Sequence, residues 1–439
     1  MTRHETALAL AVLLAVPVVA AEPIDRIEYF EGRLRFRDAD LPVRLALEAD
    51  STTGARLDVP SLLYIAEALP TERRDGGVRI ELPFGLGWIA LERAGAGWTG
   101  AATLDGEPLT MDLSPAREPP YSSSEVRFAS AGAQLAGTIV APTPGAGRRP
   151  GIVLVHPSGD QSRARWEYRG WADFFARRGF VVALYDKRGC GLSSGAHWGD
   201  DEGFAGLADD ALAAVELLRG RSDVDRERVG LFGGSQAGWV MLLAAARSPE
   251  VAFFVATSVP AVSPMEQMIQ SVEYRMRADG IAQDELLAAL AHMRLYAYVA
   301  ATGHGWESLR EAVEGARNRP FASYVFLPTA DPRAGWMGHH MSFDPVPLLE
   351  RIRLPVLALW GERDVIVPAA ENSERFRAWF ASGEGTLLTT RVFPGADHRL
   401  EVESGRDASG QWHWFGLAPG LFVEIDRWLA AQGVVSSAP

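Results

Sequence analysis

Hydrophobic and polar positions follow two different patterns along the chain. Up to about residue 121, short apolar runs at 43–47, 78–82 and 88–91 are separated by Gly, Asp and Pro clusters, which is typical of antiparallel strands. After residue 122, continuous apolar runs alternate with helical segments. Strands that are apolar on both faces and joined by helices form parallel, doubly wound sheets. The pattern therefore predicts a small β-rich domain, a linker at 115–124 and then an α/β domain.

The second pattern assigns each element of the α/β domain. The predicted strands lie at 126–128, 135–140, 151–156, 180–185, 229–232, 253–257, 355–360 and 387–393, and the first two are expected to pair antiparallel. The predicted helices lie at 171–178, 207–218, 236–246 and 421–429. Ligands of such sheets bind at the carboxyl ends of the strands. Catalytic residues are therefore expected at those ends.

Charge and the first residues narrow the possible functions. A formal net charge of −13 argues against a nucleic-acid partner, because no basic stripe would attract a phosphate backbone. Arg3 precedes an apolar run at 7–19, followed by Ala20 and Ala21, which is the pattern of a secretory signal peptide; a buried first helix is the alternative. The run is too short for a membrane span. We expect export to the periplasm or exterior, without stable membrane insertion. Cys190 is the only cysteine, so no internal disulfide can form.

One strand end carries the pattern of an activated serine. The strand at 229–232 runs into Gly-Gly-Ser-Gln-Ala-Gly at 233–238 and then into a helix. A sharp strand-to-helix turn exposes the Oγ of a nucleophilic serine, and small neighbours permit that turn. Ser235 is therefore the predicted nucleophile. Ala237 stands where the Gly-x-Ser-x-Gly motif has its last glycine.

The acid and the base follow in the order Ser, acid, His that this kind of site uses. Asp364 comes after the strand at 355–360, within Gly-Glu-Arg-Asp, and is preferred to its rival Glu362. His398 lies on a loop after the strand at 387–393 and is the predicted base, with His413 as the runner-up. A base must take the serine proton, and an acid must fix the tautomer of the base.

Two backbone N–H groups are expected to form the oxyanion hole. Gln236, directly after the nucleophile, supplies the first. The second comes from the loop at 156–163, where Pro157 has no N–H, so Ser158 is the predicted donor. His156 is expected to brace this loop.

These residues together carry a family resemblance. The loop at 156–163, the motif Tyr-Asp-Lys-Arg-Gly-Cys-Gly-Leu-Ser at 185–193, the turn at Ser235, Asp364 and His398 resemble the α/β-hydrolase superfamily. More closely, they resemble bacterial carboxylesterases of the EstD type, which have a β-rich N-terminal region. The resemblance covers about residues 122–432 and implies an ester hydrolase with a serine nucleophile.

The resemblance also has consequences for two loops. The family usually has glycine where Pro157 stands, which bears on the geometry of the oxyanion loop. The motif at 186–193 is a structural turn in the family, and Asp186 and Arg188 are expected to pair beneath the active-site loops.

A long insertion between Val262 and Pro345 is predicted to be a helical cap. Its apolar residues have helical spacing within 265–276, 284–298 and 306–316, and it is too long for a plain loop. Rising beside Ser235, it is expected to shape the substrate pocket. His339 and His340 do not predict a metal site, because adjacent histidines rarely share an ion; neither metal nor cofactor is expected.

Three functions remain open. The first is a serine esterase acting on a small-molecule ester. The second is a peptidase of the prolyl-oligopeptidase or aminopeptidase groups, for which acidic cap residues (Glu266, Glu273, Asp279) would capture a substrate amine; fold does not decide the substrate. The third is a non-catalytic binding protein on the same scaffold. The predicted division is a signal peptide (1–21), a β-rich accessory domain (22–121), the hydrolase core (122–262 and 346–432), the cap (263–345) and a flexible tail (433–439).

Overall fold

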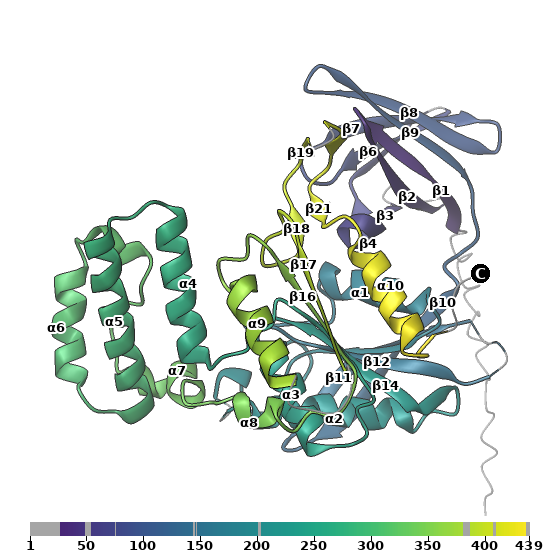
Figure 1. Ribbon diagram of the computed structural model, residues 1–439. Helices are drawn as coiled ribbons and strands as arrows, with labels where there is room; N and C mark the ends of the chain where they lie inside the picture. Colours follow the sequence, from purple (N-terminus) through teal and green to yellow (C-terminus); the bar gives the residue numbers. More distant parts are fainter. Residues whose placement is uncertain are drawn as a thin grey trace, which may run out of the picture.

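The computed structural model describes residues 27–48, 54–74, 76–143, 145, 147–200, 203–380, 387–406 and 410–435. The expected signal peptide and the end of the expected tail lie outside these ranges. Figure 1 shows a β-rich part in purple and blue, an α/β part around a central sheet, and a helical part in green at one side.

The β-rich part is one antiparallel sheet of nine strands. Its strands are β1 (Ile27–Phe36), β2 (Ala39–Glu48), β3 (Ala55–Val59), β4 (Tyr64–Leu69), β5 (Thr71–Arg74), β6 (Gly77–Leu82), β7 (Gly87–Ala94), β8 (Gly97–Leu104) and β9 (Glu107–Pro115). They lie in the order β4-β3-β2-β1-β9-β8-β7-β6-β5. Apolar and polar residues alternate along them, so one face collects a core that includes Leu34, Leu45 and Ile80.

The α/β part is built on an eight-stranded sheet. Its strands are β10 (Tyr121–Ser130), β11 (Ala133–Pro142), β12 (Arg149–Val155), β13 (Val181–Tyr185), β14 (Val224–Gly234), β15 (Phe254–Thr257), β16 (Val356–Gly361) and β17 (Leu388–Phe393). They lie in the order β10-β11-β13-β12-β14-β15-β16-β17, with β10 and β11 antiparallel and the strands from β13 to β17 parallel. This mostly parallel sheet, with the β-rich part before it, confirms the predicted fold class.

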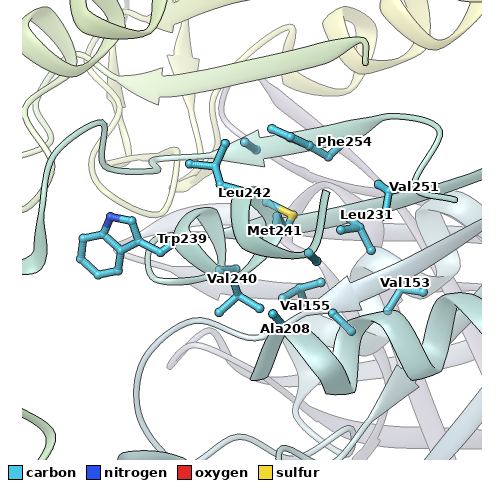
Figure 2. Packing of buried hydrophobic residues seen from close by; sticks show 14 of the residues in the cluster. Val153, Val155, Ala208, Leu231, Trp239, Val240, Met241, Leu242, Val251 and Phe254 are labelled. Atoms are coloured by element: carbon cyan, nitrogen blue, oxygen red, sulfur yellow. The ribbon is translucent and has the colours of Figure 1, made fainter. Parts of the chain in front are cut away.

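Helices cover both faces of this sheet. Helices α1 (Trp166–Ala176) and α10 (Leu421–Ala431) pack on one face, and α2 (Ala205–Arg219), α3 (Ala237–Arg247) and α9 (Ala369–Phe380) pack on the other. Successive β12 residues point to opposite faces: Ile152 packs on the face covered by α1 and α10, and Val153 packs on the face covered by α2, α3 and α9. Figure 2 shows Val153 and Val155 beside buried residues of α3 on this second face. Burial on both faces explains why these strands read as continuous apolar runs.

The insertion is helical, as its periodicity predicts. It contains α4 (Pro264–Ala278), α5 (Gln283–Thr302), α6 (Trp306–Ala316) and α7 (Trp336–His340), and α8 (Val346–Leu349) leads back to the core. Ser263 caps α4 by accepting the Glu266 N–H at 3.2 Å, and Pro264 stands in the first turn. The cap has apolar clusters of its own, around Met293 and Val313.

Two boundaries differ from the sequence expectations. Strand β10 begins at Tyr121, so only residues 116–120 connect the two sheets. Helix α1 begins at Trp166 rather than at residue 171. It contains Gly170 because a Cβ there would lie 2.3 Å from the carbonyl oxygen of Leu63, so the glycine permits close contact with the β-rich part.

A segment at 401–417, near the C-terminal end of the described chain, joins the β-rich part and the α/β part. It forms short strands β18 (Glu401–Val402), β19 (Gly405–Arg406), β20 (Trp412–His413) and β21 (Gly416–Leu417), paired as β18–β21 and β19–β20. Trp412 and Trp414 pack into the core of the β-rich part, although the sequence assigned them to the hydrolase core. The segment after His398 therefore completes the N-terminal core.

Candidate active site

Ser235 lies at the sharp turn between β14 and α3. Its φ angle is 56°, in the left-handed region that residues other than glycine rarely adopt. The Ser235 N–H donates to the Thr257 carbonyl at 3.0 Å, and the Ser235 carbonyl accepts the Gly238 N–H at 2.9 Å. These bonds hold the strained turn in place.

Close packing around this turn explains its small residues. A Cβ on Gly234 would lie 2.6 Å from Thr257 Oγ1, and a Cβ on Gly233 would lie 2.6 Å from the Cβ of Ala237. The methyl group of Ala237 thus occupies space that Gly233 leaves open. The departure from the Gly-x-Ser-x-Gly motif is accommodated.

Asp364 and His398 are hydrogen-bonded to each other. Asp364 follows β16 and is buried; its Oδ1 accepts the N–H groups of Ile366 and Val367, each at 2.8 Å. Its Oδ2 lies 2.8 Å from His398 Nδ1. A carboxylate accepts, so Nδ1 donates and Nε2 is left with a lone pair. Because both carboxylate oxygens are fixed, the imidazole orientation is fixed as well.

Ser235 and His398 line one cavity of about 280 Å³ at the carboxyl ends of the strands. Ser158 lines it too. The remaining walls are mostly apolar and come from the core: Leu154, Val155, Pro157, Gln161, Arg165, Glu167, Tyr168, Trp171, Phe232, Gly233, Gly234, Thr257, Arg399 and Leu400. None of these lining residues belongs to the cap, so the expectation that the cap shapes the pocket is not met in this structure.

The two predicted oxyanion donors follow the carboxyl ends of two neighbouring parallel strands, β12 and β14. Gln236 follows Ser235 directly and is the N-cap residue of α3, where backbone N–H groups have no intrahelical acceptor. Ser158 lies on the loop after β12. Neither N–H donates to another residue in the described part of the chain, so both are available to a ligand.

His156 braces the loop, as expected. Its Nε2 lies 2.7 Å from the Tyr185 carbonyl, and its ring packs between Tyr168 and Tyr185. Burial and the nearby Lys187 lower the pKa of His156 to about 3. The ring is therefore neutral and donates to the carbonyl.

The expected pair between Asp186 and Arg188 is wrong. Asp186 instead holds the far end of the oxyanion loop: its Oδ1 accepts Ser162 Oγ at 3.0 Å and the Arg163 N–H at 2.9 Å. Arg188 makes a bidentate pair with buried Asp210, at 2.8 and 2.7 Å. Asp186 directly follows β13 and faces the oxyanion loop, whereas Arg188 lies in the next turn and reaches Asp210 in α2, so the two residues have different partners.

The rivals for the acid and the base lie elsewhere. Glu362 is exposed and accepts the Gly395 N–H at 2.9 Å. His413 lies in β20, with its Nδ1 3.0 Å from the Trp414 carbonyl. Neither residue lines the cavity beside Ser235.

The acidic cap residues have partners of their own. Glu266 pairs with Arg375 at 2.7 Å, Glu273 pairs with Arg277 at 2.7 Å, and Asp279 accepts the Tyr324 hydroxyl at 2.7 Å. They do not line the cavity. The acidic residue that does, Glu167, is bound by Arg165 at 2.9 Å and Arg399 at 3.0 Å.

One cluster in the described residues has metal-ligand chemistry. Asp160, Cys190 and His197 place carboxylate, thiol and imidazole atoms within 4.8 Å of one another. Asp160 Oδ1 already lies 2.9 Å from His197 Nε2 and accepts the Trp198 indole N–H at 2.7 Å. The cationic side chain of Lys187 is close to both Asp160 and Cys190 and opposes a second cation. We therefore do not assign these residues as ligands.

Lys187 itself was missed in the sequence. It is fully buried, and its ammonium group contacts the oxyanion loop. The available signal was compositional: it is the only lysine among 43 Lys and Arg residues.

Comparison with known proteins identifies the family. The hydrolase family described as serine aminopeptidase, S33, matches residues 148–405, which is more than half of the chain. The chain belongs to this family. Its match includes the turn at Ser235, Asp364 and His398, and it ends within the segment that joins the two parts. No long apolar helix that could cross a bilayer occurs within the described ranges.

Individual known proteins resemble the chain over a short segment or at low sequence identity. The uncharacterized protein YfhR of Escherichia coli K12 is 33% identical over 122 residues, which is 27% of this chain and 40% of YfhR. The Pyrococcus furiosus esterase Pf2001 is 18% identical, with a TM-score of 0.42 over 63% of this chain and 84% of its own. The Pyrococcus horikoshii acylaminoacyl peptidase is 13% identical, with a TM-score of 0.40 over 81% of this chain and 57% of its own.

Proposed function

We propose that the chain is a serine hydrolase that cleaves carboxylic esters through an acyl-enzyme intermediate. The observation that carries the proposal is the strained turn at Ser235, which shares one cavity with a His398 whose Nδ1 is held by Asp364. Strained residues of this kind cluster at active sites, and this arrangement leaves His398 Nε2 as a base.

In this proposal each residue has a defined step. Ser235 Oγ attacks the ester carbonyl while His398 Nε2 takes its proton, and Asp364 stabilises the imidazolium. The N–H groups of Gln236 and Ser158 bind the developing oxyanion. His398 then gives the proton to the leaving alcohol, and water activated by the same histidine releases the acid from Ser235.

An aminopeptidase is the second candidate, because the family is described as serine aminopeptidase. Such an enzyme needs an unpaired carboxylate to hold the substrate's ammonium group. Glu167 is compensated by Arg165 and Arg399, and the acidic cap residues lie outside the cavity. Apolar walls and a compensated charge favour a neutral ester.

Two assays test the proposal. A fluorophosphonate probe should label wild-type protein and fail to label Ser235→Ala, which separates an enzyme from a binding protein. A panel of matched p-nitrophenyl esters and aminoacyl p-nitroanilides should give kcat/KM values that favour the esters. Faster turnover of the aminoacyl amides would contradict the esterase proposal and support an aminopeptidase.

We further propose that the protein is exported, on the pattern of residues 1–21. Expression in a bacterium followed by fractionation should yield periplasmic protein whose N-terminus is Glu22. Full-length protein in the cytoplasm would contradict this.

A further inference from the structure

Two donors of Lys187, in the turn after β13, hold the oxyanion loop. Lys187 Nζ donates to the carbonyl oxygens of Pro157, at 2.8 Å, and of Gly159, at 3.2 Å. The Lys187 backbone N–H donates to the Gln161 carbonyl at 3.1 Å. The side-chain amide of Gln161 in turn donates to the Ser158 carbonyl at 2.7 Å. Carbonyls on both sides of Ser158 are therefore tied to one buried ammonium group.

Because the peptide bond is planar, these contacts also constrain the direction of the Ser158 N–H. In a trans peptide the C=O and the following N–H point in opposite directions. Since the Pro157 carbonyl points at Lys187, the Ser158 N–H of the same peptide points away from it. Ser158 lines the cavity beside Ser235, and its N–H donates to no other residue in the described part of the chain.

We propose that Lys187 is a positioning residue that holds the oxyanion loop by its carbonyls and thereby aims the Ser158 N–H at the substrate's developing oxyanion. The inference rests on the proposed function. A cationic donor on the Pro157 carbonyl also polarises that peptide, because hydrogen bonds to charged groups are stronger than neutral ones. The Ser158 N–H consequently becomes a better donor.

The surroundings are built to keep this amine in place. The Lys187 Nζ lies 3.8 Å from the centre of the Trp198 ring, whose indole N–H donates to Asp160 at 2.7 Å. Burial lowers the pKa of Lys187 to about 7, while Cys190 and Asp160 raise it in part. His156, on the other side, is kept neutral partly by this ammonium group.

A buried lysine where 42 of the 43 basic residues are arginine points to a need for a compact ammonium group. An ammonium is a point charge with three donors, whereas a guanidinium is a planar fork. Two carbonyls of one tight loop and an aromatic face suit the first shape. The surface pairs elsewhere in the described chain use arginine instead.

The first arm of the test compares Lys187→Met with Cys190→Ser, a control in the same cluster. Lys187→Met should lower kcat by about 10- to 100-fold, below the roughly 10²–10³ that loss of an oxyanion donor costs, and KM should change less than twofold. The affinity for a boronic acid inhibitor should fall by the factor seen in kcat. Cys190→Ser should retain wild-type kcat. Wild-type kcat in Lys187→Met, or an equal change in kcat with Cys190→Ser, would overturn the proposal.

The second arm needs no variant. Protein labelled with ε-¹³C lysine has one side-chain signal, because Lys187 is the only lysine. Its titration midpoint should rise when the boronic acid binds, since a negative oxygen in the hole favours the ammonium form. An unchanged midpoint with inhibitor bound would overturn the proposal even if Lys187→Met failed to fold. Wild-type protein that neither hydrolyses esters nor reacts with the fluorophosphonate would instead refute the proposed function.

Discussion

Replacing Lys187 with Met should remove a pH-dependent part of the protein's stability, in addition to lowering activity. The folded protein holds the pKa of Lys187 at about 7, against 10.5 for the ordinary side chain. Between these values the unfolded chain binds more protons than the folded chain. The free energy of unfolding of the wild type therefore rises with pH across this window. Met has no proton to bind and lacks this slope.

The magnitude follows from the two pKa values. At pH 7 the buried amine costs about 4 kcal/mol of stability relative to a neutral group, and at pH 9 it costs about 2 kcal/mol. Loss of two hydrogen bonds to carbonyls lowers the stability of the variant by an amount that does not depend on pH. Relative to the wild type, the free energy of unfolding of Lys187→Met should accordingly fall by roughly 2 kcal/mol between pH 7 and pH 9.

Urea denaturation at several pH values measures this difference. Fluorescence and circular dichroism must report the same transition, because a protein with several parts need not unfold in two states. Arg310→Met is the matched control: Arg310 is exposed and pairs with Glu307 on the cap, so this change should not alter the pH dependence. A difference between Lys187→Met and wild type that stays constant from pH 7 to pH 9 would show that the folded protein does not lower the pKa of Lys187.

Three further variants test the site and its support. Asp364→Asn should lower kcat on the order of 10⁴, because the acceptor that fixes the His398 tautomer is lost; steady-state kinetics showing less than a tenfold loss would point to another acid. Ser158→Ala keeps the backbone N–H and should retain most activity, whereas Ser158→Pro should cost roughly 10²–10³ in kcat, with circular dichroism to verify folding. Equal activity of the two variants would show that another residue supplies this oxyanion donor. Arg188→Met leaves Asp210 buried without its bidentate partner and should cost about 3–5 kcal/mol in urea denaturation, while a loss under about 1 kcal/mol would show that this pair is not compensating a buried charge.

Local patterns in the sequence were sufficient for the central sheet, and they also led to the candidate site residues. The strand before Ser235 and the strand before Asp364 are buried on both faces, which produces uninterrupted apolar runs. The residues at their ends then follow from the topology, since parallel strands end at one edge. The cap helices were visible for a similar reason: each has one apolar face, which gives helical spacing.

Features that depend on distant contacts could not be predicted in this way. Trp412 and Trp414 complete a core made by strands about 300 or more residues earlier, and no local sequence pattern indicates that they pack there. Asp186 and Arg188 are two residues apart and oppositely charged, which suggested a pair, but their partners Arg163 and Asp210 come from other elements.

The orientation of the cap also depends on contacts between residues that are distant in the sequence. Its helices could be located from periodicity, but their orientation could not. In the structure α4 reaches the loop after Asp364, where Gln267 donates to the Ile366 carbonyl at 2.7 Å. The cavity beside Ser235 is lined without it.

Trapping the acyl-enzyme identifies the nucleophilic residue itself. Rapid acid quenching during turnover of a p-nitrophenyl ester, followed by peptide mapping with mass spectrometry, should find the acyl mass on the peptide that contains Ser235. Ser235→Ala should show no such adduct and should lose activity by several orders of magnitude, on the scale of ~10⁶. Acylation of a different residue, or a Ser235→Ala variant that retains a tenth of wild-type kcat, would contradict the account.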